Sequence, residues 1–240
     1  DQGGRVYVSE YSTGRVQVFD EDGTFVTQWT IPETPYLSNI AVNRDGILVA
    51  PVGGRLQEFA ANTGHAFGPM AITEAESAES TIFALADGGW LTVLGDDIVR
   101  LNSAGDEVLR IPDAFVNATG TSEMLPIVAA DGLGNIYALG RFANLVLKFD
   151  AEGRYINRFG GSSVAGADTP GTLSSPQSIA VDGDGRVLVG DIFGIQVYDG
   201  DGRYQGIIDT ESFPFGVAVH DDGRIFAIER DHVGVYRMNE

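Results

Sequence analysis

The stretch PQSIAVDGDGRVLVGDIFGIQVYDGDGRYQGII, residues Pro176–Ile208, contains four short apolar runs separated by turns rich in glycine and aspartate. The runs are SIAV, RVLVGD, IQVYD and YQGII. Short runs of alternating or continuous apolar character, closed by such turns, are typical of antiparallel β-strands. The stretch therefore predicts a four-stranded antiparallel meander.

The rest of the chain repeats this unit. An Asp-Gly or related turn follows an apolar run in every copy, and a second turn follows an aromatic strand end, as in FDEDG, FDAEG and YDGDG. Successive markers lie about 40 to 50 residues apart, which is the spacing of propeller blades. We predict an all-β fold, a single-domain six-bladed β-propeller of four-stranded antiparallel blades. Its repeat units lie roughly at 1–30, 37–72, 80–111, 126–160, 176–209 and 215–240.

The first and last units are incomplete. The first unit (RVYVSE, RVQVFD, FVTQW) lacks a leading strand, and the last unit (GVAVHD, RIFAIE, VGVYRM) lacks a trailing strand. An unpaired strand edge invites aggregation. We therefore expect the chain to be part of a longer one whose upstream residues supply a missing strand.

Charge and composition exclude several classes of partner. The chain of 240 residues carries a net charge of −19, with 34 acidic and 15 basic residues. This disfavours nucleic acid and anionic membrane surfaces as partners, because both select basic proteins. No apolar run is long enough for membrane insertion, and the absence of cysteine excludes disulfides and thiolate metal sites. The acidic surface either reflects the source organism or attracts cations or a basic partner.

The repeat motif resembles the NHL repeat family of β-propellers. In the fifth unit Pro176, the run Ile179-Ala180-Val181-Asp182, Gly185, Asp191 and the pair Tyr198-Asp199 carry the resemblance, and in the fourth unit Asp131, Gly134, the run Asn135-Ile136-Tyr137, the pair Phe149-Asp150 and Gly153 carry it. The resemblance implies the propeller fold and, by family habit, a prokaryotic cell-envelope or extracellular setting. It leaves the function open, because this fold hosts scaffolds, receptor ectodomains, RNA binders, lyases and hydrolases.

The connections between the second and third strands of each unit differ in residue type while the scaffold repeats. Variable loops on a regular scaffold are where function is usually placed, and aromatic residues beside arginine are typical of interface hot spots. An alternative is that the rings only cover the ends of the blade cores. The predicted partner-binding face comprises Glu10, Tyr11, Asp96, Asp97, Arg141, Phe142, Asp191, Phe193, Glu229, Arg230 and His232.

Two groups of aspartates have competing interpretations. Asp191 and its equivalents are candidates for strand-end acceptors of backbone N–H groups. Asp182, Asp184, Asp199 and Asp201 are weak candidates for a structural Ca²⁺ ion, because hard cations take clustered carboxylates. Turn chemistry explains the same residues without an ion, since glycine supplies a positive φ and aspartate caps the turn. No other cofactor is expected.

Catalytic constellations are poorly represented. Of the three histidines, His65, His220 and His232, only His220 ends a first strand of a unit, so a three-histidine metal centre is not predicted. Only Asn39 and Glu79 match the oxygen ligands that lactone hydrolases of related fold use. We therefore predict a non-catalytic binding module for a protein, peptide or glycan, rather than an enzyme. The alternative is a metal-dependent hydrolase or lyase.

Overall fold

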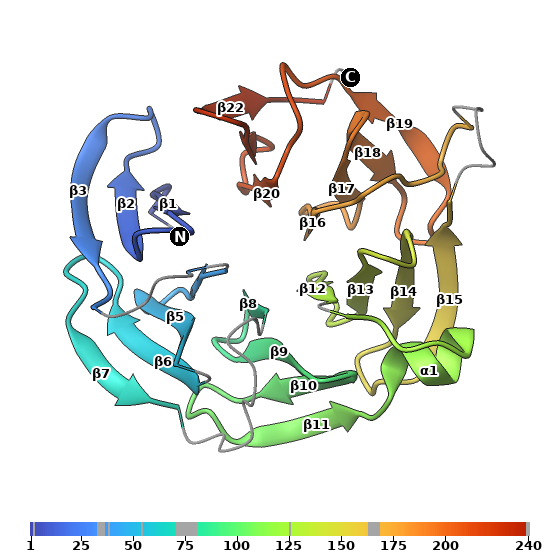
Figure 1. Cartoon of the computed structure of the whole chain (residues 1–240), viewed down its shortest axis with the longest axis horizontal. Helices are drawn as coiled ribbons and strands as arrows, with labels where there is room; N and C mark the ends of the chain where they lie inside the picture. The colour runs from blue at the N-terminus through green and yellow to red at the C-terminus, as the bar shows by residue number, and fades with distance from the viewer. Residues whose placement is uncertain are drawn as a thin grey trace. The chain divides into compact units, whose positions relative to one another are not determined.

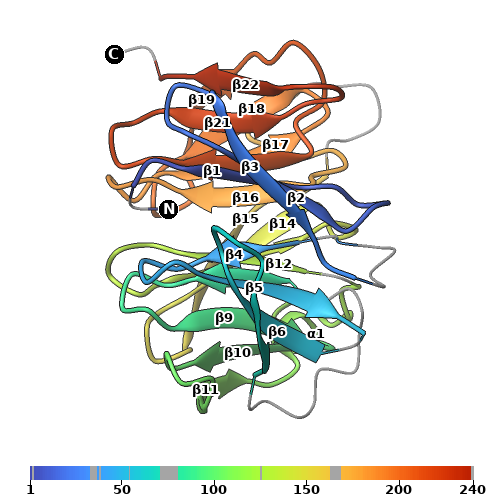
Figure 2. The same cartoon turned by 90° about the vertical axis from the view of Figure 1, so that its left-hand side faces the viewer.

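The computed structural model describes residues 1, 3–32, 37, 39–53, 55–70, 81–124, 126–162 and 169–238. The chain forms two compact units, Asp1–Pro112 and Asp113–Glu240. Most of their strands are labelled in Figure 1, and Figure 2, turned by 90°, also labels β4 and β21. Each unit holds three antiparallel sheets whose strands follow the chain order, so the predicted all-β fold of six blades is confirmed.

The first unit contains eleven strands in three sheets. The three-stranded sheet holds β1 (Val6–Ser9), β2 (Arg15–Phe19) and β3 (Phe25–Thr30). The next sheet holds β4 (Ala41–Val42), β5 (Ile47–Val52), β6 (Arg55–Ala60) and β7 (Ala66–Pro69). The third holds β8 (Ile82–Ala84), β9 (Trp90–Leu94), β10 (Asp97–Leu101) and β11 (Glu107–Ile111).

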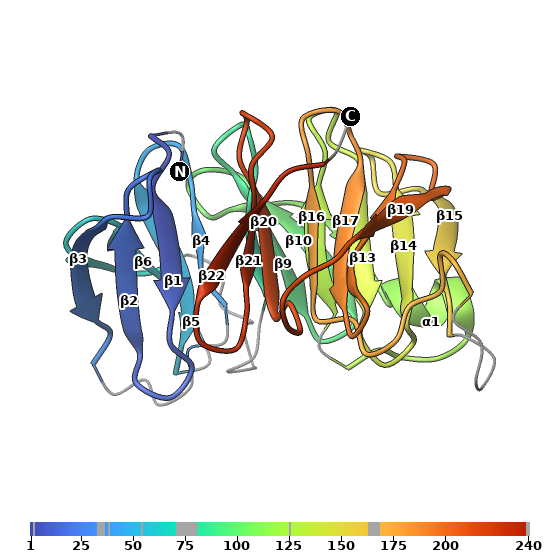
Figure 3. The same ribbon diagram turned by 90° about the horizontal axis from the view of Figure 1, so that it is seen from above.

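The second unit begins with a short helix, α1 (Ala114–Thr119), seen in Figure 3. Its first sheet holds β12 (Ile127–Ala130), β13 (Ile136–Gly140), β14 (Leu145–Phe149) and β15 (Tyr155–Gly160). Its second holds β16 (Ser178–Val181), β17 (Val187–Asp191), β18 (Gly194–Tyr198) and β19 (Tyr204–Ile208). The last holds β20 (Gly216–Val219), β21 (Ile225–Ile228) and β22 (Val233–Tyr236).

A five-residue turn recurs between the strands, and its geometry explains the glycine pattern of the sequence. In the turn Asp182–Arg186, the first residue's N–H bonds to the carbonyl oxygen of the fifth at 3.0 Å. The fourth residue, Gly185, has a φ of 78° and donates to the carbonyl of Asp182. The Asp182 carboxylate accepts the backbone N–H groups of Asp184 and Arg186 at 3.0 and 2.8 Å. Glycine is favoured at the fourth position because it adopts a positive φ without a Cβ clash.

The sheets of each unit bury apolar faces against one another. In the first unit Trp90 and Leu101 join Val49 and Leu56 in one core cluster. In the second unit Leu188 and Ile195 pack with Ile225 and Ala227 in another. These side chains are fully or almost fully buried. The alternating pattern of each strand thus supplies one layer of each core.

The sheet β20–β22 has three strands among the described residues, as the sequence predicts for its missing trailing strand. Two residues at equivalent register positions differ in their exposure to solvent. Val197 of β18 pairs with Leu188 and with Gly206 of β19, and it is 4% exposed. Val235 of β22 occupies the equivalent position opposite Phe226, and it is 57% exposed. Val235, which has no strand on its other side among the described residues, is thus far more exposed than its counterpart Val197.

Candidate functional site

The predicted face lies on the connections between second and third strands and on two adjoining strand residues, Asp97 of β10 and Asp191 of β17. Three of these connections belong to the second unit: residues 141–144 join β13 to β14, residues 192–193 join β17 to β18, and residues 229–232 join β21 to β22. In the first unit the corresponding connections are residues 10–14, 53–54 and 95–96. The side chains on them divide into buried acids, paired charges and exposed aromatic residues.

Asp191 ends β17 and is fully buried, so its carboxylate is not presented to a partner. It accepts the backbone N–H of Phe193 at 2.9 Å and that of Ser174 at 3.2 Å. Gln196 of β18 also bonds to it, while burial is the largest influence and raises the pKa of this carboxyl. Asp191 therefore links the 192–193 connection to the segment that leads into β16. The strand-end acceptor role expected for it is confirmed.

Glu229 is the corresponding buried backbone acceptor in the last sheet. It follows β21 at the position equivalent to Asp191, and it is 3% exposed. Its carboxylate accepts the backbone N–H of Ser212 at 2.6 Å and the hydroxyl of Tyr236. Gly234 leaves room for this pair, because a Cβ there would lie 2.5 Å from Glu229 Oε1 and from the Tyr236 ring. The longer acid thus requires a glycine where β18 carries Gln196.

Glu123 supplies the corresponding carboxylate in the first sheet of the second unit. Gly140 stands where Asp191 stands in the next sheet, and a Cβ there would clash with the Phe115 ring at 2.6 Å. Glu123, from the segment before β12, accepts the N–H groups of Phe142 and Ala143 at 3.1 and 2.9 Å. It is 6% exposed. The sequence interpretation missed Glu123, and the one available signal was the absence of an acid at Gly140.

The acids of the face in the first unit are paired near the surface. Glu10 bonds to the Arg15 guanidinium, which lowers the pKa of its carboxyl. Asp97 accepts from Arg110 Nη1 at 2.9 Å. Asp96 lies in the turn between β9 and β10. Tyr11 is the exposed ring of this group, with 57% of its surface accessible.

Exposed apolar side chains accompany Arg141 in the second unit. Phe142 is 68% exposed, Ile192 52% and Phe193 38%. Arg141 Nη2 donates to the side-chain oxygen of Gln177, immediately before β16. The Nε of Arg141 is buried and has no hydrogen-bond partner among the described residues. This arginine is therefore held by a neutral amide.

His232 lies among three carboxylates, and Arg230 is exposed beside it. Its Nδ1 is 3.0 Å from Asp231 Oδ1, and its Nε2 is 3.8 Å from Glu211 Oε2 and 4.0 Å from Glu229 Oε1. The contact with Asp231, together with the two glutamates, raises the pKa of the imidazole.

This arrangement predicts a pH-dependent contribution to stability. Because the folded-state pKa is raised, protonated His232 stabilises the fold at low pH, and this contribution disappears as the pH rises through the folded-state value. We expect His232→Asn to lower the melting temperature more at about pH 5.5 than at about pH 8.5. Asp231→Asn should reduce that difference. Equal destabilisation by His232→Asn at both pH values would contradict the assignment.

The four Ca²⁺ candidates form two separate turns, and each turn contains an arginine. Arg186 bonds to Asp182 at 2.7 Å and to Asp184 at 2.8 Å. Arg203 makes the same contacts with Asp199 and Asp201 at 3.3 and 2.9 Å. No group of three or more metal-ligating side chains is found within the described ranges. A Ca²⁺ ion in these turns stays a prediction.

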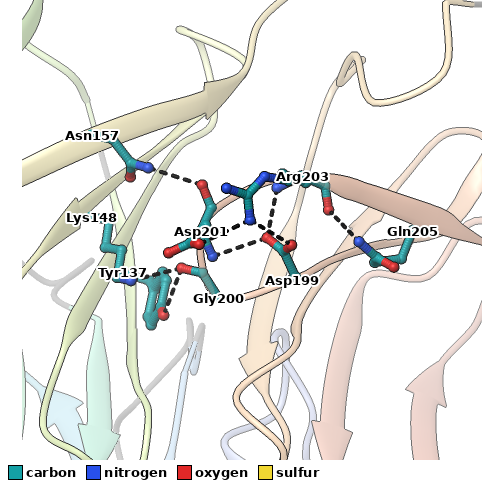
Figure 4. A network of polar contacts seen from close by, with 8 residues as sticks. All are labelled: Tyr137, Lys148, Asn157, Asp199, Gly200, Asp201, Arg203 and Gln205. Atoms are coloured by element: carbon teal, nitrogen blue, oxygen red, sulfur yellow. Dashed lines mark hydrogen bonds and ion pairs between the residues drawn. The ribbon is translucent and has the colours of Figure 1, made fainter.

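The Asp199 turn docks on the preceding sheet through its backbone, as Figure 4 shows. The carbonyl of Gly200 accepts Lys148 Nζ at 2.7 Å and the Tyr137 hydroxyl at 3.3 Å. Asn157 Nδ2 donates to the carbonyl of Asp201 at 2.9 Å. Burial raises the pKa of Tyr137. These contacts join two sheets, so the network is structural; it also uses the only lysine of the chain.

The remaining catalytic candidates that the structure describes each make a local contact within their own unit. Asn39 accepts the backbone N–H of Ile82 at 2.7 Å, so its side-chain oxygen joins the second and third sheets. His220 contacts Asp222 in a turn, at 3.1 Å. His65 packs against Phe67. Glu79 lies outside the described residues.

No described helix has the length and apolar character needed to cross a membrane.

Comparison with known proteins yields the fold. No family model and no curated protein matches the chain. A gluconolactonase from Xanthomonas campestris is similar, with a TM-score of 0.68 and 18% identity over 94% of this chain and 79% of that one. Virginiamycin B lyase from Staphylococcus aureus has a TM-score of 0.64 and 14% identity over 100% and 83%. A protein of unknown function from Bacteroides caccae has a TM-score of 0.66 and 14% identity over 93% and 81%. These likenesses show a six-bladed β-propeller.

Proposed function

We propose that this β-propeller is a non-catalytic binding module, and that the second-to-third-strand connections of residues 113–240 take a protein or peptide partner. One observation carries the proposal. The buried acids of this face, Asp191, Glu229 and Glu123, are all engaged by backbone N–H groups, while Phe142 and Phe193 remain exposed. Acids used to hold loops are poorly suited to proton transfer, whereas exposed rings on held loops suit recognition.

Rigid loops strengthen this interpretation. Each anchor lies between a connection and the segment that precedes the first strand of the same sheet, as Asp191 does between Phe193 and Ser174. A surface held in place loses little conformational entropy when a partner binds.

We also propose that the repeats are of the NHL type and that the protein is located outside the cell or in the cell envelope.

Selection from a random displayed-peptide library tests the proposal. The purified chain serves as bait, and the double variant Phe142→Ala/Phe193→Ala serves as the counter-selection. We expect peptides that bind the wild-type chain and lose about tenfold or more in affinity against the variant, because exposed aromatic anchors dominate such interfaces. Phe67→Ala is a matched control, since Phe67 is 56% exposed on β7 in the other unit. Failure to enrich any peptide, or equal binding to all three proteins, would contradict the proposal.

A second candidate function is that of a hydrolase or lyase, and the His232 cluster favours it. A histidine beside the buried Glu229–Tyr236 pair is an arrangement that could move a proton. Two of the similar structures are enzymes by name, and a histidine-to-alanine variant of the staphylococcal lyase is described as catalytically inactive. Turnover of a lactone or of streptogramin B that disappears in His232→Ala would support this candidate. Without such turnover the binding module stands.

A further inference from the structure

Arg141 differs from the turn arginines of the same unit in having no acidic partner among the described residues. Arg154, Arg186 and Arg203 each bridge two acidic side chains of their own turns. The described residues give Arg141 no ion pair; its hydrogen bond is to the neutral amide of Gln177. Gln177 is itself held, because its side-chain N–H donates to the carbonyl of Ser175 at 3.3 Å.

The guanidinium of Arg141 has donors left for a ligand. It presents five N–H donors, and one nitrogen, Nη2, is used by Gln177. Its Nε is buried without a partner in the described part of the chain, so the donors that a ligand can reach are those of the terminal nitrogens Nη1 and Nη2. A partly buried guanidinium with open donors is satisfied best by a carboxylate, which accepts two parallel hydrogen bonds and neutralises the charge.

Exposed apolar side chains lie on the connection that holds Arg141 and on that of the sheet that follows Gln177. Phe142 is adjacent in sequence and 68% exposed. The backbone N–H of Gln177 bonds to the carbonyl of Gly190 at 2.8 Å, which places the Arg141–Gln177 link beside the end of β17. The connection that follows carries Ile192 and Phe193. The link thus joins the 141–144 connection, which carries Phe142, to the sheet whose 192–193 connection carries Ile192 and Phe193.

From these observations we infer that Arg141 is a carboxylate-binding anchor, and that the partner presents a carboxylate flanked by apolar or aromatic groups. The inference rests on the proposed binding function and names its ligand class. The chain's net charge of −19 opposes anions at long range. Recognition must therefore combine the local guanidinium with apolar contacts to Phe142 and Phe193. Gln177 is a positioning residue in this site.

Two short peptides that differ only in charge test the inference. The probes are the acetylated and amidated tripeptides Phe-Glu-Phe and Phe-Gln-Phe, titrated into the whole chain by calorimetry. We expect the glutamate peptide to bind about tenfold or more tightly than the glutamine peptide, as a charge-assisted pair predicts. Arg141→Gln should abolish that preference. Arg141→Lys, which keeps the charge but not the forked geometry, should retain part of it.

Arg158→Gln is the matched control. Arg158 lies on β15 opposite Leu147, so its replacement should leave the preference unchanged. Equal affinity of both peptides for the wild-type chain, with binding lost in Phe142→Ala/Phe193→Ala, would overturn the carboxylate inference and leave the binding function standing. If neither peptide bound at millimolar concentration, both would be contradicted. Thermal melting of every variant separates these outcomes from misfolding.

Discussion

Asp191→Ala is expected to lower the free energy of unfolding by about 2–4 kcal/mol, because it removes a fully buried carboxylate that accepts hydrogen bonds from two partly buried backbone donors and from Gln196. The N–H groups of Ser174 and Phe193 lose their shared acceptor, and Gln196 loses its side-chain partner. Urea denaturation measures the change. Amide hydrogen exchange should show faster exchange at Ser174 and Phe193 specifically, since those two donors lose their bonds.

Asp184→Ala is the matched control, in the same sheet and of the same residue type. Its side chain is 76% exposed and pairs with Arg186 at the surface. Exposed pairs contribute little, so this variant should change stability by no more than about 1 kcal/mol. Comparable losses for the two variants, or unchanged exchange at Ser174 in Asp191→Ala, would refute the anchoring role.

The second large effect is expected for Gly202→Ala. Gly202 has a φ of 85°, and a Cβ there would lie 2.3 Å from the Phe159 ring. Phe159 in turn packs on Tyr198, with ring centroids 5.0 Å apart. The substitution therefore combines backbone strain with displacement of a packed ring, at a cost of about 2–4 kcal/mol in the free energy of unfolding.

Gly185→Ala measures the backbone strain alone, so that the contribution of the ring contact can be obtained by difference. Gly185 holds the same position of the same turn type with a φ of 78°, and nothing lies within 4 Å of the Cβ position. Its replacement should cost only the backbone term, about 1 kcal/mol. Thermal melting of both variants gives the comparison. Equal losses would mean that the Phe159 contact contributes nothing.

The fold could be predicted because its signals are local. Short apolar runs and positive-φ glycines such as Gly185 and Gly202 specify hairpins within a few residues. Repetition then predicted six sheets. The same local logic identified Asp191 as a strand-end acceptor. It did not reveal the arginine at the fifth position of the turns, such as Arg186, although the residue is adjacent in sequence. This arginine pairs with the turn aspartates that the sequence offered as Ca²⁺ ligands.

The site was less accessible to sequence reasoning, because its contacts are long-range. Glu123 acts on Phe142 from a segment without strand pattern, so no periodicity indicated it. Gln177 and Arg141 are 36 residues apart and meet only when neighbouring sheets pack. Burial also divided the predicted face: Asp191 and Glu229 lie inside, while Tyr11, Phe142 and Arg230 are exposed. Spacing alone could place these residues on one set of connections but not distinguish anchors from contacts.

The most direct test of the binding account is the Nε–H resonance of Arg141 in a ¹⁵N correlation spectrum. The resonance is assigned by its loss in Arg141→Lys. The account predicts a downfield shift that saturates when the Phe-Glu-Phe peptide is titrated in, and little change with Phe-Gln-Phe, because a carboxylate bound at the terminal nitrogens polarises the whole guanidinium, the buried Nε–H included. A resonance that stays unmoved while the peptide binds elsewhere would contradict Arg141 as the anchor of this face.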